Sequence, residues 1–128
     1  MVCAILDQFG NIVKEASIPT TTPGETVAKM LEFFSPYKLT SLGIGTFGQV
    51  DLNPKSPTYG SILNTPKLAW KGFNYLEGFK SLITHIGIDT NVNESSMGET
   101  TFGTSKGLSN VIYITIGKGI GVGVLSEG

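Results

Sequence analysis

The sequence predicts an α/β fold, a mixed sheet with flanking helices, on three observations. Short runs rich in β-branched residues alternate with segments whose apolar residues recur every three to four positions, the period of helices that pack on a sheet. Seventeen glycines gather mainly around these runs, where turns and close backbone approaches require them. With 128 residues, the chain has the length of one domain that can bury a core.

Composition narrows the functional classes. Nine basic and ten acidic side chains give a formal charge of −1, which favours neither nucleic acid nor an anionic membrane as a partner. No apolar run approaches the ~18 residues of a membrane span, and no signal-peptide pattern opens the chain. The single cysteine, Cys3, cannot form an internal disulfide. We therefore expect a cytoplasmic protein that binds neither nucleic acid nor membranes.

The first third of the chain is predicted to form a β-hairpin and a helix. Residues 2–6 and 12–18 are rich in β-formers and are separated by turn residues. Thr22 and Glu25 form a capping box, and Pro23 suits the first helical position. The apolar face of the helix, which should pack on the sheet, comprises Val27, Met30, Leu31 and Phe34.

A third strand, over residues 39–46, leads into a long irregular excursion that extends to Trp70. Three prolines, Pro54, Pro57 and Pro66, restrict the excursion. Long ordered excursions in compact domains tend to be functional. We expect Trp70 to pack beneath this loop.

A second helix is predicted after Asn74, which resembles the N-cap of another capping box with Glu77. The apolar face of this helix comprises Leu76, Phe79, Leu82 and Ile83. His85 follows as a boundary residue. No second histidine or nearby cysteine accompanies it, so neither a metal site nor a catalytic triad is expected there.

Residues 86–99 are the stretch around which the chain is organised, and they predict a strand, a polar loop and a helix over 92–102. Ligands of open α/β sheets bind beyond the carboxyl ends of the strands, so the polar residues 89–93 are the first candidate site. The alternative is structural, because Asp, Asn and Thr after a strand often cap the next helix.

The last predicted elements are strands over residues 111–116 and 122–125. The turn between them contains Gly117, Lys118, Gly119 and Gly121. Glycines in such a turn allow backbone N–H groups to converge on an anion such as phosphate. A plain β-hairpin is the alternative.

Two stretches resemble a known family. They are Asp-Thr-Asn-Val-Asn at 89–93 with Met-Gly-Glu at 97–99, and Gly-Ile-Gly-Thr-Phe-Gly-Gln-Val-Asp-Leu-Asn-Pro-Lys-Ser-Pro-Thr-Tyr-Gly at 43–60. Both resemble the fructokinase branch of the repressor, open-reading-frame and kinase (ROK) family of sugar kinases. The resemblance implies an actin-like ATPase, ribonuclease H-like fold, of which residues 1–128 are a single, partial N-terminal kinase lobe.

The same resemblance implies roles for individual residues. Asn91 holds the position of the family's catalytic Asp, and the expected sugar contacts are Thr65, Thr90, Asn91 and Asn93. The family's second phosphate loop matches Gly117, Lys118, Gly119 and Gly121, with Lys118 in place of Thr. Other departures are Gln49 in place of Pro and Leu68-Ala69 in place of Pro-Gly.

The resemblance implies ATP and Mg²⁺ as cofactors and fructose as the sugar. It also implies that the chain lacks the family's first strand, second lobe and zinc site. We expect the first hairpin either to pair elsewhere or to expose a sheet edge, and exposed edges favour homo-oligomers. Because Asn91 cannot act as a base, we expect a fructokinase-like lobe with weak or no activity. The alternative is a non-catalytic lobe that binds sugar or a protein partner.

Overall fold

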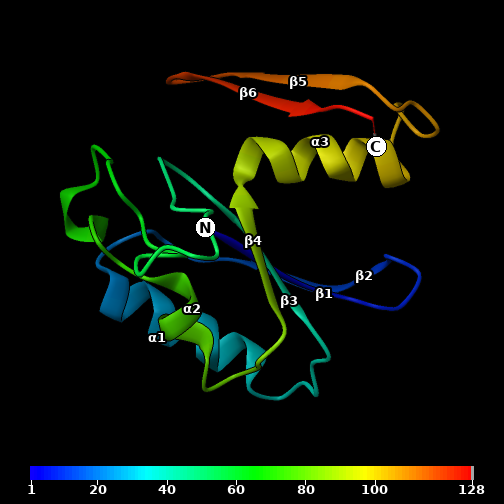
Figure 1. Cartoon of the computed structure of the whole chain (residues 1–128). Coiled ribbons are helices and arrows are strands. Elements are labelled where there is room, and N and C mark those ends of the chain that lie inside the picture. The colour runs from blue at the N-terminus through cyan, green and yellow to red at the C-terminus, as the bar shows by residue number, and fades with distance from the viewer. Residues whose placement is uncertain (128) are drawn as a thin grey trace.

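The computed structural model describes residues 1–127, in which strands and helices alternate and confirm the α/β class. Figure 1 shows α1 and α2 side by side next to β3 and β4 in the lower part of the view, and α3 with the β5–β6 hairpin at the top. The elements are β1 (Val2–Leu6), β2 (Ile12–Ser17), α1 (Pro23–Phe34), β3 (Leu42–Thr46), the 3₁₀ turn η1 (Leu68–Trp70), α2 (Tyr75–Phe79), β4 (Ile86–Thr90), α3 (Asn91–Phe102), β5 (Val111–Ile116) and β6 (Ile120–Leu125).

The strands pair in three two-stranded sheets, whereas the sequence had suggested a single mixed sheet. β1 and β2 are antiparallel, β3 and β4 are parallel, and β5 and β6 are antiparallel. The sheets stay separate because no strand within residues 1–127 connects the edges of β1 and β3. Since β1 pairs only with β2 in this part of the chain, the first hairpin keeps a free edge, as predicted.

Helix α1 covers the core as its periodicity predicts. Thr22 is the N-cap, and its hydroxyl accepts a hydrogen bond from the main-chain N–H of Glu25 (3.4 Å), while Pro23 begins the helix. Burying a large apolar side chain contributes roughly 1.5–3 kcal/mol relative to exposure. The core side chains are Cys3, Ile5, Ile18, Val27, Met30, Phe34, Ile62, Trp70, Tyr75 and Phe79.

The excursion after β3 is ordered by its own hydrogen bonds. The carboxylate of Asp51 accepts hydrogen bonds from the hydroxyls of Ser56 and Thr58 and from the main-chain N–H of Asn53 (3.0 Å). The bond from Ser56, followed by the bond from Thr58, lowers the pKa of Asp51. This part of the loop is therefore a compact turn held by an ionised carboxylate.

Trp70 packs beneath the excursion, as predicted. Its side chain is 1% exposed, and its indole N–H donates to the main-chain oxygen of Thr21 (2.8 Å). The ring stacks on Tyr75 with centroids 6.1 Å apart and meets Phe47 and Phe73 edge to face. The indole therefore ties the excursion to the segment before α1.

Helix α2 is shorter than its sequence suggested. Asn74 caps it, accepting from the main-chain N–H of Glu77 (3.0 Å), but the helix ends at Phe79. Leu82 and Ile83 continue only as turns whose N–H groups bond to the oxygen of Phe79. The β-branched residues that follow Leu82 and the serine before it have low helix propensity, which accounts for the early end.

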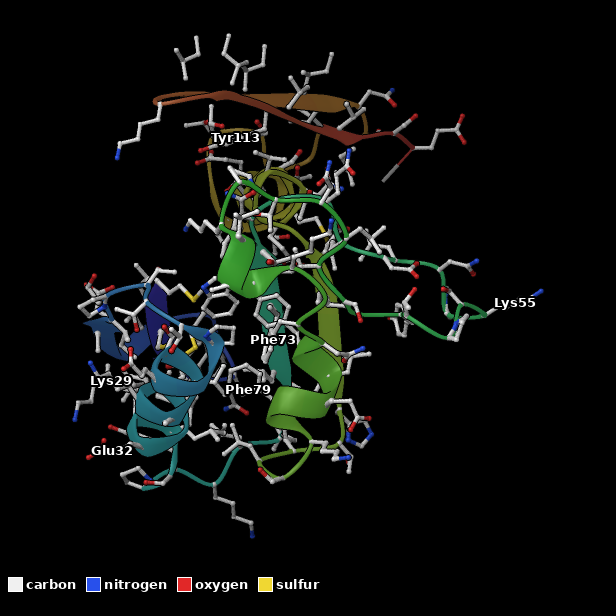
Figure 2. All side chains as sticks on the ribbon, turned by 90° about the vertical axis from the view of Figure 1, so that its left-hand side faces the viewer. Lys29, Glu32, Lys55, Phe73, Phe79 and Tyr113 are labelled. Atoms are coloured by element: carbon white, nitrogen blue, oxygen red, sulfur yellow. The ribbon has the colours of Figure 1, made fainter. Side chains whose placement is uncertain are left out.

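The β5–β6 hairpin rests on α3 and presents an apolar outer face. In Figure 2 a row of side chains on the hairpin points away from α3, while Tyr113 lies on the side that faces the helix. β-branched side chains make up this outer face, each more than half exposed: Ile112, Ile114, Ile116, Ile120, Val122 and Val124. Along both strands, more exposed and less exposed residues alternate, as expected for a two-stranded sheet that is covered on one face only.

No helix within residues 1–127 is long and apolar enough to cross a membrane.

Candidate functional site

The candidate site lies at the carboxyl ends of the two parallel strands. β3 and β4 are in register, so that Thr46 lies beside Thr90 where both strands end. The expected polar loop between strand and helix is absent. β4 extends through Thr90, and α3 begins at Asn91 without any connecting residues, because Thr90 itself serves as the N-cap.

Hydrogen bonds fix the strand–helix junction. Thr90 Oγ1 accepts from the main-chain N–H of Asn93 (3.3 Å). Asp89 Oδ1 accepts from the main-chain N–H of Thr90 (2.6 Å) and from Asn93 Nδ2 (2.8 Å). The capping interpretation of this stretch is therefore confirmed. Thr90 and Asn93, two of the predicted sugar contacts, lie together at this junction.

Asn91 is the first residue of α3 and is exposed. Within residues 1–127 its main-chain oxygen accepts a hydrogen bond from Ser95 Oγ (2.9 Å). Asp89, two residues earlier, instead accepts a hydrogen bond from Asn93 in the first turn of the helix. The exposed side chain of Asn91 therefore makes fewer hydrogen bonds within residues 1–127 than the side chains of Asp89, Thr90 and Asn93.

Glu94 is a residue of this junction that the sequence analysis did not single out. Burial raises the pKa of its carboxyl, and the charge of Asp89 raises it further. The side chain packs on Gly45 of β3, where an added Cβ would lie 3.2 Å from Glu94 Cγ and 3.3 Å from Asn91 Cα. The sequence signal for this contact is Gly45 itself, because a glycine inside a β-strand often marks a place where another segment of the chain approaches closely.

Strand β6 of the hairpin packs against the start of α3 through two of its glycines. A Cβ added at Gly121 would lie 2.7 Å from Val92 Cγ1, and one at Gly123 only 2.2 Å from the main-chain oxygen of Val92. Gly121, which was predicted as a phosphate contact, therefore has a packing role in the structure. Gly123 was missed, because nothing in the sequence pairs it with α3.

Gly117 and Gly119 have no such structural explanation. Neither has a positive φ, and a Cβ at either position would meet no atom within 4 Å. Lys118 between them is exposed. The structure makes this segment a plain hairpin turn, closed by a hydrogen bond from Gly117 N to Gly119 O (2.9 Å). A close approach of another molecule remains as a reason for two glycines here.

Thr65 lies in a shallow groove on the excursion. The groove has a volume of about 420 Å³ and is lined by Gly48, Gln49, Asn64, Thr65 and Pro66. Gly48 follows β3 by two residues, and a Cβ added there would lie 3.4 Å from Thr65 Cβ. Thr65 therefore lies near the carboxyl end of β3, the end of the sheet at which the β4–α3 junction also lies. Its hydroxyl accepts from the main-chain N–H of Lys67 (3.1 Å).

His85 is exposed just before β4, at the boundary where the sequence analysis put it. Residues 1–127 contain no group of three or more His, Cys, Asp or Glu side chains arranged to hold a metal ion. The titratable groups of the junction are Asp89 and Glu94, and Asn93 hydrogen-bonds to the first of them.

Known proteins share this chain's sequence and fold. The model of the ROK family matches residues 1–128. A putative fructokinase of Bacillus subtilis is 42% identical over 99% of the chain, and a fructokinase of Pediococcus pentosaceus is 41% identical over 98% of it. The chain spans only 43% and 44% of the lengths of these relatives.

A solved structure shares the fold at low sequence identity. It is a ROK family glucokinase from Streptomyces griseus in complex with glucose and AMPPNP, which matches 97% of this chain with a TM-score of 0.75 and 22% identity. The match covers 40% of the glucokinase. The likeness confirms the actin-like fold class, and the full-length match to the family model establishes that the chain belongs to the ROK family.

Proposed function

We propose that the chain is the N-terminal lobe of a fructokinase-like sugar kinase, with weak or no turnover in these 128 residues. The observation that carries the proposal is the convergence of Thr90, Asn91 and Asn93 at the carboxyl ends of β3 and β4, where strand β6 packs on the neighbouring Val92 through Gly121 and Gly123. Its fructose specificity rests on relatives named fructokinase at about 41–42% identity. Its localisation is proposed to be cytoplasmic.

The junction supplies groups suited to a sugar. Hydroxyl and amide side chains donate and accept hydrogen bonds, as sugar hydroxyls require. Asn91 is exposed, and Thr65 lines the groove next to Gly48, just beyond the end of β3. The proposed role of these residues, with Thr90 and Asn93, is to bind and orient the sugar hydroxyl that is phosphorylated.

Asn91 is the reason for the proposed weak activity. In sugar phosphorylation a carboxylate accepts the proton of the attacking hydroxyl. An amide oxygen accepts a hydrogen bond but has no useful basicity. Loss of a general base typically lowers the rate by ~10²–10⁴, or about 3–5 kcal/mol. Asp89 is a poor substitute because Thr90 N–H and Asn93 already hydrogen-bond to its Oδ1.

The turn at Gly117 and Gly119 fits a polyphosphate. Neither glycine is needed for packing or for a positive φ, so both leave space for a close approach of an anion, and Lys118 adds a positive charge. ATP with Mg²⁺, when bound, supplies the phosphoryl group for transfer. Gly117, Lys118 and Gly119 would hold its phosphates, and Gly121 would keep the turn close to α3.

Sugar binding is the first test. Fructose at ten times its Kd should stabilise the chain by about 1.4 kcal/mol, which is a Tm rise of ~5 °C for a domain of this size. Asn91→Ala should reduce the shift, whereas Gln8→Ala, in the exposed β1–β2 turn, should retain it. No shift at high millimolar fructose would contradict a sugar site.

Turnover is the second test, by coupled detection of ADP. The chain should release ADP at the background rate with fructose, ATP and Mg²⁺, and Asn91→Asp should raise the fructose-dependent rate, with Gln8→Glu as the charge-matched control. Robust release by the unmodified chain would contradict the proposed weak activity.

A second candidate function is a non-catalytic lobe that binds sugar or a protein partner. This candidate is favoured by Asn91, which stands where the family has its catalytic Asp. The amide is not a base, but it and the neighbouring polar side chains can still form hydrogen bonds. A fructose-dependent Tm shift combined with an inactive Asn91→Asp variant would favour this candidate over the kinase.

A further inference from the structure

Gln49 is a polar residue of the groove beside Thr65 that the proposed sugar contacts do not include. The groove is lined by Gly48, Gln49, Asn64, Thr65 and Pro66. Gln49 and Asn64 are exposed, whereas Thr65 is 7% exposed. A primary amide both donates and accepts hydrogen bonds, as a hydroxyl group does. The Gln49 side chain can therefore pair with a hydroxyl group that enters the groove.

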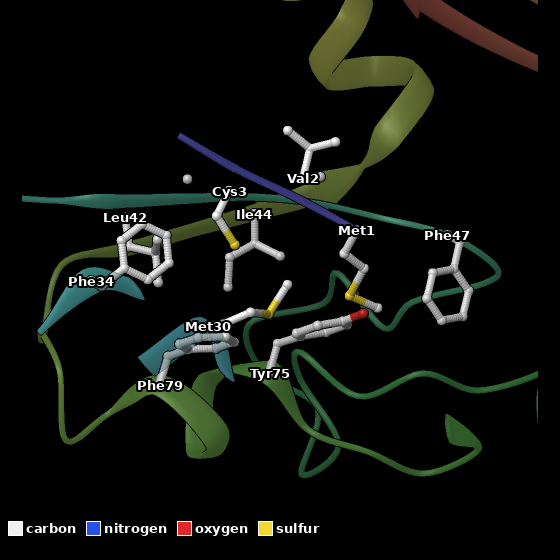
Figure 3. Close-up of a pocket in the computed structure, with 12 residues that line it drawn as sticks. Met1, Val2, Cys3, Met30, Phe34, Leu42, Ile44, Phe47, Tyr75 and Phe79 are labelled. Carbon is white, nitrogen blue, oxygen red and sulfur yellow. The ribbon is translucent and has the colours of Figure 1, made fainter. Parts of the chain in front are cut away.

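The groove lies just beyond the strand ends at which the sugar is proposed to bind. In Figure 3 the main chain runs along β3 from Leu42 to Phe47, and the next residue, Gly48, is the first residue of the groove. Gly48 follows Thr46, the last residue of β3, by two positions, which span at most about 7 Å. Thr46 in turn lies beside Thr90. The groove and the β4–α3 junction therefore open at the same end of the β3–β4 sheet.

The main chain of Gln49 is fixed by hydrogen bonds. Its N–H donates to the main-chain oxygen of Asn64 (3.3 Å), and its oxygen accepts from the N–H of Leu63 (2.8 Å). The next residue, Val50, forms an antiparallel bridge with Ile62, which is fully buried. Gln49 thus projects from an anchored segment, and such anchoring lowers the entropy cost of a contact made by its side chain.

The conformation of Gly48 keeps the two sides of the groove together. Its φ of 74° lies in the left-handed region that favours glycine. A Cβ added there would lie 3.3 Å from the main-chain oxygen of Asn64 and 3.4 Å from Thr65 Cβ. The segment that carries Gln49 therefore lies against the segment that carries Thr65.

The chemistry of the groove suits a neutral polyhydroxyl ligand. Its lining residues are all uncharged. The ammonium of Lys67 lies over the ring of Phe47, 4.0 Å from its centre. Thr65 Oγ1 accepts from the main-chain N–H of Lys67 (3.1 Å), which leaves the hydroxyl hydrogen of Thr65 to be donated. One ligand hydroxyl could thus accept from Thr65 and donate to the amide oxygen of Gln49.

We propose that Gln49 is a specificity-determining residue of the sugar site, whose side-chain amide hydrogen-bonds one hydroxyl group of the sugar. The inference rests on the proposed function, because it needs a sugar bound at the ends of β3 and β4. The family that the sequence resembles has proline at this position, and the side chain of proline offers neither a donor nor an acceptor. A site that pairs with a hydroxyl group discriminates against analogues that lack it. Because Gln49 is exposed, the discrimination is that of a single neutral hydrogen bond.

Gln49→Met tests the role of the amide. It keeps an unbranched side chain of similar length and the main-chain hydrogen bonds, and removes the donor and the acceptor. By isothermal titration calorimetry, the Kd for fructose should rise roughly two- to tenfold. Gln8→Met, in the exposed β1–β2 turn, is the matched control and should leave the Kd unchanged. An equal Kd for the unmodified chain and Gln49→Met would overturn the role of Gln49 and leave sugar binding intact.

Monodeoxy analogues of fructose test the direct contact. Each analogue lacks one hydroxyl group, so comparing the unmodified chain with Gln49→Met completes a double-mutant cycle. The two proteins should have equal Kd values for one analogue, the one without the hydroxyl that Gln49 binds, and should differ roughly two- to tenfold for the others. A difference that persists for every analogue would overturn the proposed hydrogen bond. No fructose binding by the unmodified chain would overturn the sugar site itself and this proposal with it.

Discussion

Gly123→Ala tests whether the β5–β6 hairpin depends on close contact with α3. The added Cβ would lie 2.2 Å from the main-chain oxygen and 2.6 Å from the carbonyl carbon of Val92. Real Cβ atoms do not approach so closely. Because the neighbour is backbone, no rotamer change relieves the contact, and the helix must move away from the hairpin.

The cost follows from two opposing terms. Overpacking of this kind costs about 1–3 kcal/mol, and replacing glycine stabilises by about 0.4–1 kcal/mol through the unfolded state. The net loss of unfolding free energy is about 1–2 kcal/mol, or a Tm decrease of ~4–8 °C for a chain of this length. Thermal and urea unfolding, followed by far-UV circular dichroism, measure both quantities.

Gly119→Ala is the matched control in the same hairpin. A Cβ there meets nothing within 4 Å, and the φ is not positive. This variant should be as stable as the parent or more stable by about 0.4–1 kcal/mol. Equal stability of Gly123→Ala and Gly119→Ala would refute the argument that the helix and hairpin are in contact at Val92.

Three further predictions concern the core, the cap of α3 and pH. Tyr75→Phe removes the hydroxyl that accepts from Thr46 Oγ1 (3.0 Å), and should cost about 0.5–1.5 kcal/mol in urea unfolding followed by Trp fluorescence. Thr90→Ala removes the N-cap of α3 and should cost about 0.5–2 kcal/mol by circular dichroism. Glu94→Gln should stabilise the chain at neutral pH, because burial and then Asp89 raise the pKa of Glu94 in the folded state. The contribution of Glu94 to stability is therefore fully present below its unfolded pKa, near 4.5, and is lost as the pH rises through the folded value.

Each of these predictions has an internal control. Thr101→Ala lies on the same helix, but its hydroxyl bonds only to the oxygen of Met97, so it should change stability far less than Thr90→Ala. For Glu94, urea midpoints from about pH 4 to pH 8 should fall more steeply with rising pH in the parent than in Glu94→Gln; parallel curves would contradict a raised pKa. A Tyr75→Phe variant as stable as the parent would mean that the Thr46 hydroxyl finds another partner.

Local signals in the sequence predicted most elements correctly. The capping residues Thr22 and Asn74 begin α1 and α2 as expected. Trp70 is buried as predicted from its size and its place after a long loop. These features depend on neighbours within a few positions, which a single sequence contains.

Features that depend on distant neighbours were not predictable. Nothing local to Gly123 reveals that α3 approaches it, and Gly45 in a strand signals a close approach without naming α3 as the partner, because these contacts join segments about 30 to 50 residues apart. The missing polar loop was an error of the same kind: Thr90 can end a strand and cap a helix at once, and only the packing of α3 against β3 decides that it does both. The roles of Asn91, Thr65 and the Gly117 turn in binding remain predictions.

Helix α3 is the element through which the hairpin contacts the rest of the described chain most extensively. Protection of the β5 and β6 amides against hydrogen exchange therefore depends on α3 remaining docked, and the helix and hairpin should open together as one cooperative unit. The N-terminus of that helix is also the candidate site. A ligand bound at Asn91 and Thr90 would slow exchange in strands that it does not touch, so the amides of the hairpin report on the occupancy of the site.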